Sequence, residues 1–423
     1  MTRRVVILGG GTGGTLVANR LRRMTDEASV DIVVVDRDDR HIYQPGLLFV
    51  PFGTTRPESL VRPRSAQLAK GVTYRLDTVD QVDLDARTVA MSSGDRLGYD
   101  VLVIATGAEL MPEETEGLTG PGWLKNVFTF YSLDGASALA RALDSFDGGR
   151  LAVNVVDMPI KCPVAPLEFA FLADAYFRRR GIRDRVELSL VTPLDGAFTK
   201  PIASATLGGM FEERGINLVT EYNTGEVDSS AGRLVSYDGR EEDFDLAVVV
   251  PVHGGSAWVG RSDGLGDPLN FVPTDEQTLQ SMARPEVFVL GDAADVRASK
   301  AGSVAHFEGH VLCENVRAHL AGEAPSARYD GHANCFIETG AGRALLIDFN
   351  YETEPMPGRY PGRIGLPLLA ESRTNHVAKR LFEQFYWHVL LPGRDVPGIG
   401  ADMPMAGKVP APMPASSLAG KER

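Results

Sequence analysis

The alternation of hydrophobic and polar positions is clearest at the start of the chain. Residues 5–8 form a short β-branched run, a glycine-rich turn follows at once, and residues 15–23 carry apolar side chains at helical spacing. A second apolar run, residues 32–35, ends at Asp36. This pattern predicts a strand, a tight turn, a helix and a second strand.

The glycines of that turn have the spacing of a dinucleotide-binding fingerprint. We expect Gly9 to allow a sharp turn, Gly11 to admit a pyrophosphate at the helix N-terminus, and Gly14 to let helix and strand approach closely. Asp36 is placed to accept hydrogen bonds from an adenosine ribose. A glycine pattern alone also occurs in ordinary strand-to-helix turns, but together with both strands and the acid it favours a bound dinucleotide.

Two later apolar runs end at positions that would face the same ligand. One ends just before Thr106 and Gly107, where the missing side chain would let the backbone approach the dinucleotide again. The other, residues 285–292, ends in Gly291 and Asp292. An acid at a strand end can take the ribityl hydroxyls of a flavin; the alternative is an ordinary turn, and the order of the three glycine sites favours the flavin.

Two further segments are candidates to contact a flavin ring. The loop at residues 40–49, which includes Gln44, is aromatic and apolar, and it faces either a flat ring or the protein core. Lys300 and Gly302 precede a predicted helix at residues 304–320. A cation or a helix N-terminus there would stabilise the anion of a reduced flavin.

The middle of the chain repeats the strand–helix pattern. After a linker rich in proline and glycine, the periodicity predicts helices at residues 133–146 and 165–180. It predicts strands at residues 150–156 and 186–191. The turn of this second unit, residues 158–166, contains three prolines and no glycine. Because it offers few free N–H groups and no room for a pyrophosphate, we expect that NADH is not the electron donor.

Shorter patterns predict a small antiparallel layer and a separate C-terminal region. Strands at residues 72–79 and 88–91 form the layer, and strands at 335–338 and 343–349 form a C-terminal hairpin. Residues 355–367 are rich in proline and glycine and are expected to be irregular.

The last predicted helix, residues 375–391, is amphipathic. Lys379 and Arg380 are among its polar positions, and its apolar residues fall on one broad side: Leu381, Phe382, Phe385, Tyr386, Trp387 and Leu390. It would lie in the headgroup region of a membrane, or else cover a core or form a dimer interface. We expect the tail from Val396 to be loosely ordered.

Taken together, these elements predict an α/β protein with two Rossmann-like dinucleotide-binding domains plus a C-terminal region with a hairpin and an amphipathic helix. We expect the FAD-binding domain to consist of two parts, residues 1–112 and residues 268–322. The second Rossmann-like domain, residues 113–267, lies between them, and the C-terminal region is residues 323–423.

Composition narrows the classes of function. The chain has 423 residues, a net charge of −13 and a pI near 5.2, so nucleic acid is not an expected partner. Three cysteines cannot form a disulfide scaffold, no metal site is indicated, and the N-terminus enters the first strand directly, which suggests the cytoplasm. No apolar run approaches the roughly 20 residues that span a bilayer, so any membrane contact would be peripheral.

The candidate chemistry lies with the cysteines. Cys162 precedes a predicted helix and neighbours Lys161, and both the helix dipole and the cation would favour a reactive thiolate with a pKa of about 3.5 to 7.5. Cys335 opens a C-terminal strand, and the residues alone do not place it opposite Cys162. Cys313 is expected in the core. Glu168, in the first turns of the Cys162 helix, would shuttle protons if it is buried.

These residues together resemble the sulfide:quinone oxidoreductases, a family of flavoproteins with two dinucleotide-binding domains. The resemblance covers nearly the whole chain, and the motifs that carry it are the glycine turn, His41 to Gly46, Ala105 to Gly107, Lys161 to Pro163, Gly291 with Asp292, and Asn334 to Phe336. The early motifs are shared with many flavoproteins, so the specificity for sulfide depends on the cysteine pair.

The resemblance implies FAD in the first domain, Cys162 and Cys335 on one face of its ring, and a quinone on the other face. It further implies hydrosulfide as the substrate, polysulfide or zero-valent sulfur as the product, and Glu168 near the sulfur site. We expect a homo-oligomer, attached peripherally to the cytoplasmic side of the cell membrane.

The sequence departs from the family pattern at two places. Many members have a third cysteine upstream of the first redox cysteine, where this chain has Phe128 to Tyr131, and some have a histidine where this chain has Lys200. The departures leave covalent attachment of the flavin and the proton path open. Three alternatives remain: an enzyme like type II NADH:quinone oxidoreductase, a cytochrome-linked sulfide dehydrogenase, and a flavin-containing persulfide sensor.

Overall fold

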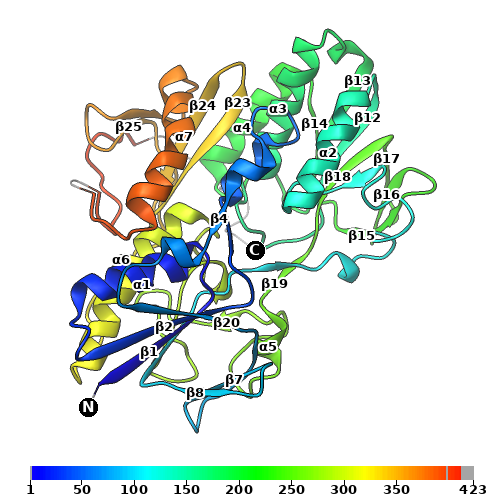
Figure 1. Ribbon diagram of the computed structural model, residues 1–423. Coiled ribbons are helices and arrows are strands. Elements are labelled where there is room, and N and C mark those ends of the chain that lie inside the picture. The colour runs from blue at the N-terminus through cyan, green and yellow to red at the C-terminus, as the bar shows by residue number, and fades with distance from the viewer. Residues whose placement is uncertain (1, 397–398, 411–423) are drawn as a thin grey trace.

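The first sheet is the scaffold of the predicted dinucleotide site. The computed structural model describes residues 2–396 and 399–410 (Figure 1). Five parallel strands lie in the order β21 (Val287–Val289), β9 (Val101–Ile104), β1 (Arg3–Leu8), β2 (Val30–Asp36) and β5 (Val72–Leu76). The strand from the later part of the chain thus completes the sheet that the N-terminal residues begin.

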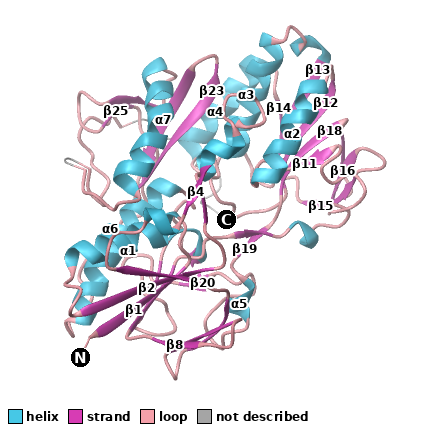
Figure 2. Cartoon of the chain, in the orientation of Figure 1, coloured by secondary structure: helices cyan, strands magenta, loops and turns pink. Residues whose placement is uncertain are grey.

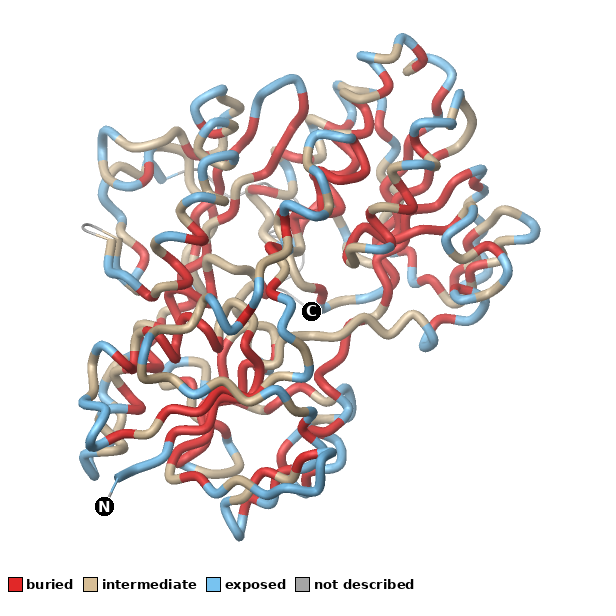
Figure 3. The backbone as a smooth tube through the Cα atoms, in the orientation of Figure 1, coloured by how far each residue is buried: buried red, intermediate tan, exposed pale blue. Residues whose placement is uncertain are grey.

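Alternating side chains of β1 explain how this sheet is covered. Val5 and Ile7 belong to the core beneath helices α1 (Thr12–Met24) and α6 (Gly302–Leu320), whereas Val6 and Leu8 belong to a separate core on the other face. That second face is covered by a small antiparallel sheet of β6 (Val79–Asp83), β7 (Thr88–Met91) and β8 (Arg96–Gly98). Both faces are buried, as a parallel sheet requires (Figure 3).

The prediction for residues 72–79 is partly wrong. Residues 72–76 are β5, which extends the parallel sheet beside β2, and the antiparallel layer begins only at Val79. As an edge strand, β5 is only partly buried, which is also typical of a strand in an exposed antiparallel layer.

A second parallel sheet forms the other Rossmann-like unit. Its strand order is β11 (Val127–Phe128), β18 (Leu246–Val250), β12 (Gly149–Val155), β13 (Val186–Val191) and β14 (Asn217–Val219). Helices α2 (Leu133–Ser145), α3 (Ala165–Arg179) and α4 (Pro201–Arg214) accompany it (Figure 2). The predicted helices at 133–146 and 165–180 and the strands at 150–156 and 186–191 are confirmed.

Helix α4 was not predicted, because only Ala203, Leu207 and Phe211 form its buried stripe and glycines interrupt its pattern. The remaining short elements are β3 (Arg40–Ile42), β4 (Val61–Pro63), β10 (Glu109–Leu110), β15 (Thr224–Asp228), β16 (Arg233–Ser236), β17 (Glu241–Asp243), β19 (His253–Gly254), α5 (Ala257–Gly260), β20 (Val272–Pro273) and β22 (Ala294–Asp295).

Two short segments, β10 and β19, pair antiparallel where the chain crosses between the two units. After β19, Trp258 and Val259 already pack in the core under the first sheet. The chain therefore returns to the first unit before residue 267, where the sequence analysis placed the boundary.

The C-terminal region contains the predicted hairpin, β23 (Ala333–Gly340) with β24 (Arg343–Phe349). Within the stretch expected to be irregular, β25 (Gly358–Tyr360) pairs with β26 (Leu366–Leu368). Helix α7 (Arg373–Phe385) follows and continues as a π-helical turn, Tyr386–Leu390. Most of the tail from Val396 lies outside the described residues.

Hydrogen bonds connect the C-terminal end of α7 to the first domain. The Tyr386 hydroxyl lies 2.7 Å from the Thr12 hydroxyl, in the glycine turn, and 2.6 Å from His41 Nε2. The Asn19 side-chain amide donates to the Leu391 carbonyl at 2.8 Å. Tyr386 is almost fully buried, so this end of the helix is part of the core. Among the described residues, no helix is both long and apolar enough to cross a membrane.

Candidate active site

The N-terminal turn has the form that a dinucleotide requires. Gly9 has φ +92°, and a Cβ there would lie 2.5 Å from the Ala105 carbonyl oxygen. A Cβ on Gly14 would lie 1.8 Å from the Gly9 carbonyl oxygen, so helix and strand approach as closely as predicted. Around a Cβ on Gly11, by contrast, no protein atom lies within 4 Å. The open side of Gly11, at the uncapped N-terminus of α1, fits a pyrophosphate.

Asp36 lies beside this turn, as predicted. Its carboxylate accepts hydrogen bonds from the Gly10 N–H at 2.6 Å and the Arg37 N–H at 2.7 Å, and it pairs with Arg64. Arg64 is a partner that the sequence analysis missed, since nothing in its local pattern connects it with the fingerprint. The contact between Asp36 and a ribose stays a prediction.

The second and third glycine sites also border this region. The Thr106 hydroxyl is buried and has no hydrogen-bond partner among the described residues, and the space beside Gly107 is open. An orphaned hydroxyl next to open backbone is what a bound ligand would satisfy.

At the Gly291–Asp292 turn, the Gly291 N–H donates to Glu308 at 2.6 Å, and burial raises the pKa of Glu308 to about 7. Burial raises the pKa of Asp292 too, against the attraction of Lys300 and Lys161. Contact of these groups with FAD stays a prediction.

Lys300 is held differently from what the sequence suggested. Its ammonium donates to the Asp292 carbonyl at 3.0 Å and the Ala294 carbonyl at 2.8 Å, and it lies over the Phe271 ring. It therefore supports the turn itself. The N–H groups at the start of α6, where Gly302 is the first residue and no side chain caps the helix, are better candidates for the anion of a reduced flavin.

The loop that contains Gln44 mostly lines the core. His41 and Tyr43 are buried against Tyr386 and Trp387, and burial lowers the pKa of His41 to about 4. Gln44 itself is exposed. For His41 and Tyr43 the structure thus favours the core-lining alternative.

Cys162 occupies the turn between β12 and α3. Its backbone is left-handed, with φ +50°; its N–H donates to the Lys300 carbonyl at 2.6 Å, and its carbonyl accepts from the Tyr131 hydroxyl at 3.2 Å. These bonds hold the thiol at the head of α3, next to the segment that forms the Gly291–Asp292 site.

The ionisation of Cys162 depends on groups that the sequence argument did not include. Burial raises the pKa of Cys162 well above its ordinary value, and Glu168 and Cys335 raise it further. Among the groups with the largest influence, Lys379 from the distant helix α7 is the one that lowers it.

Cys335 lies in the same buried site. It is 9% exposed in β23, and burial, together with Glu168, raises its pKa to about 12. Helix α3, which follows Cys162, packs against β23, which carries Cys335, and Cys335 acts on the ionisation of the Cys162 thiol. Both thiols are free. Cys313 is fully buried in α6, so its assignment to the core is confirmed.

Glu168 connects the elements of this site. It is almost fully buried, its Oε1 accepts the Glu338 N–H at 2.7 Å, and it forms an ion pair with Lys379. Lys379 also donates to the Phe336 carbonyl at 3.1 Å. Burial raises the pKa of Glu168 despite Lys379, which suits a group that exchanges protons. The sequence analysis missed Lys379, which it placed among the polar positions of a membrane helix.

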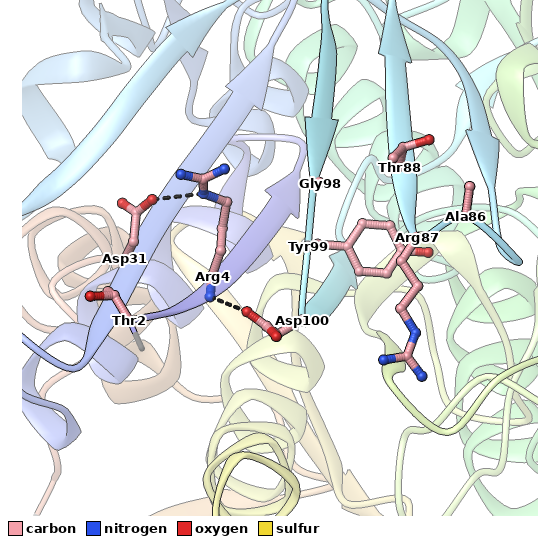
Figure 4. A pocket seen from close by; sticks show the side chains of 9 residues that line it. All are labelled: Thr2, Arg4, Asp31, Ala86, Arg87, Thr88, Gly98, Tyr99 and Asp100. Atoms are coloured by element: carbon pink, nitrogen blue, oxygen red, sulfur yellow. Dashed lines mark hydrogen bonds and ion pairs between the residues drawn. The ribbon is translucent and has the colours of Figure 1, made fainter.

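A surface cavity of about 540 Å³ lies apart from this site (Figure 4). It is at the N-terminal end of β1, where Arg4 Nε bonds Asp31 at 2.8 Å and the Arg4 N–H donates to Asp100 at 2.7 Å. Ligands of open parallel sheets bind at the carboxyl ends of the strands, which here is the end that carries Gly9 and Gly107.

Comparison with known proteins agrees with this geometry. Residues 3–156 match the family model described as pyridine nucleotide-disulphide oxidoreductase. Two relatives named mitochondrial sulfide:quinone oxidoreductase each cover 92% of this chain, and this chain covers 86% of each. The one from Dictyostelium discoideum is 29% identical and the one from Mus musculus 26%.

A solved structure has the same fold. The sulfide:quinone oxidoreductase of Aquifex aeolicus superimposes with a TM-score of 0.79 at 19% identity, covering 93% of this chain and 92% of that chain. The fold and the glycine site are those of a flavoprotein with FAD as its cofactor, and residues 3–156 are similar to the pyridine nucleotide-disulphide oxidoreductases. The chain resembles the sulfide:quinone oxidoreductases, as the sequence predicted.

Gly11 offers a direct test of the FAD site. Gly11→Ala should leave the midpoint of thermal unfolding of the FAD-free protein unchanged, since the new methyl group meets no protein atom, and should weaken FAD binding about tenfold or more. Flavin titration of the apoprotein measures the affinity. Gly208→Ala in α4, also in open space, is the control and should bind FAD normally. Unchanged FAD affinity in Gly11→Ala would place the cofactor elsewhere.

Proposed function

We propose that this chain is a sulfide:quinone oxidoreductase, in which sulfide is oxidised at Cys162 and Cys335 and two electrons pass through FAD to a quinone. The observation that supports the proposal is the ion pair of Glu168 with Lys379, which joins α3, preceded by the half-buried Cys162, to β23, which carries the buried Cys335. The relatives at 26% and 29% identity over 92% of the chain support the same activity.

In the proposed reaction, hydrosulfide attacks a Cys162–Cys335 disulfide or sulfur-bridged form. The old sulfur–sulfur bond breaks, a new one forms to the incoming sulfur, and one cysteine is left as a persulfide and the other as a thiolate. FAD, when bound, would accept the electron pair and pass it to the quinone. Sulfur would leave as polysulfide or on a small thiol acceptor.

Glu168 is the proposed proton acceptor for this exchange. A carboxyl whose pKa burial raises can hold the proton that hydrosulfide or a thiol releases. Tyr131 and the Lys300 carbonyl hold the backbone of Cys162, so the sulfur stays at the head of α3 during the exchange.

Peripheral attachment to the cytoplasmic side of a membrane is part of the proposal, but through a smaller apolar surface of α7 than expected, which keeps Leu381 and adds Val377. Tyr386, Trp387 and Leu390 are buried, so they cannot meet lipid. The exposed apolar residues are Val377 and Leu381, at 53% and 60% exposure, in a shallow groove. One such face gives modest binding, which an oligomer of the chain would multiply.

Sulfide titration tests the proposed activity. Anaerobic sulfide should bleach the oxidised flavin band of the wild-type protein, whereas Cys162→Ser and Cys335→Ser should lose rapid bleaching because each removes one partner of the exchange. Cys313→Ala, in the core, is the matched control and should bleach normally. Normal bleaching in both serine variants would defeat the assignment. Rapid bleaching by NADH would favour the NADH:quinone alternative.

Vesicle flotation tests the membrane face. Replacing Leu381 with Glu should weaken binding to anionic phospholipid vesicles about tenfold or more, because a carboxylate replaces an apolar group at the proposed contact. Tyr237→Glu is the control, since Tyr237 is 82% exposed in the second unit. A point substitution is preferable to deletion of α7, whose end is part of the core. Equal flotation of both variants would contradict the contact.

A further inference from the structure

One lysine reaches into the space between the two cysteine-bearing elements. Lys379 belongs to α7, yet its side chain is only 12% exposed. Its ammonium pairs with Glu168 of α3 and donates to the carbonyl of Phe336, the residue that follows Cys335 in β23. A positive charge is thereby held where the elements that carry Cys162 and Cys335 meet.

Titratable groups face the two thiols from several elements. Around Cys162 they are Tyr43, Tyr131, Glu168, Asp292, Cys335 and Lys379, and around Cys335 they are Cys162, Glu168, Asp348 and Lys379. Lys379 is the only cation among these groups, and Lys161, next to Cys162 in the chain, is drawn to Asp292 and Glu109 instead. A thiolate at either position would therefore depend on Lys379 for its compensating charge.

The pair of Glu168 and Lys379 allows a thiolate to form without adding net charge to the buried site. If a thiol gives its proton to Glu168, the S–H bond breaks, an O–H bond forms on the carboxyl group, and no electron is transferred. The negative charge moves from oxygen to sulfur while the ammonium stays. The transfer therefore creates no uncompensated buried charge, which would be costly.

We propose that Lys379 is the counter-ion shared by Glu168 and the reactive sulfurs, and that Glu168 takes the proton when a sulfur becomes a thiolate. The inference deepens the proposed function and rests on it for the identity of sulfide as substrate. Its chemical content, the control of thiol ionisation by a residue of α7, can be measured without sulfide.

The surroundings of Lys379 keep it charged and in place. Burial would lower the pKa of Lys379, but Glu168 and Glu338 raise it above its ordinary value. His376, one helical turn earlier in α7, binds the Glu338 carboxylate through Nδ1 at 2.9 and 3.0 Å. Helix α7 is thus attached to β23 at two successive turns, and the ammonium is held against Glu168.

Alkylation of the cysteines by iodoacetamide, followed against pH in the reduced FAD-loaded protein, tests the proposal. Mass spectrometry gives separate rates for Cys162 and Cys335. Lys379→Met should raise both thiol pKa values and slow alkylation at a fixed pH about tenfold, the change that corresponds to one pKa unit. Lys379→Arg should restore most of the rate. Lys70→Met, at an exposed lysine, should match the wild type.

The variant Glu168→Gln is expected to change the alkylation rate in the opposite direction. With the carboxylate removed, Lys379 is left to the sulfurs alone, so alkylation should become faster than in the wild type, again by about tenfold. Misfolding would not give opposite signs at two adjacent positions, and flavin absorbance with the midpoint of thermal unfolding verifies the fold. If Lys379→Met does not fold, the double variant with Glu168→Gln, which buries no charge, should alkylate more slowly than Glu168→Gln alone.

Unchanged alkylation profiles, or a change of the same sign in both variants, would overturn the proposal. The two proposals can fail separately. If the alkylation rates shift in opposite directions but sulfide does not bleach the flavin, the role of Lys379 is supported and the proposed function is refuted.

Discussion

The buried carboxylate of Glu168 joins three elements that are far apart in the sequence. It belongs to α3, it accepts the Glu338 N–H of β23, and it pairs with Lys379 of α7. Removing either partner of the pair would leave the other charge buried without compensation, which costs far more than the pairing gains. Cys162 at the head of α3 and Cys335 in β23 share one buried site as a consequence of this arrangement.

Local signals in the sequence were sufficient to predict the strand–turn–helix unit of the first domain. Gly9 and Gly14 could be assigned correctly because their roles depend on backbone within one strand–turn–helix unit. The helix after Cys162 and the strands on either side of it follow from apolar periodicity in the same way. The C-terminal hairpin of β23 and β24 was predicted from its turn.

What could not be predicted depends on contacts between distant residues. Lys379 lies on an amphipathic helix whose pattern is equally compatible with a membrane surface, and only the packing of α7 on β23 shows which side is buried. The thiol pKa of Cys162 depends on burial and on Lys379, neither of which the sequence argument included. Arg64 reaches Asp36 from a separate turn, without any motif. Helix α4 has only a narrow buried stripe of three residues, and two glycines in its middle weaken the helical signal.

The central claim is that Cys162 and Cys335 exchange bonds with each other. The most direct measurement is peptide mapping by mass spectrometry after mild oxidation of the reduced protein with a small disulfide, without reducing agents during digestion. The account predicts one cross-linked peptide pair that joins Cys162 to Cys335 through a disulfide, with Cys313 unmodified. Mixed disulfides formed separately at Cys162 and at Cys335, with no link between them, would contradict it.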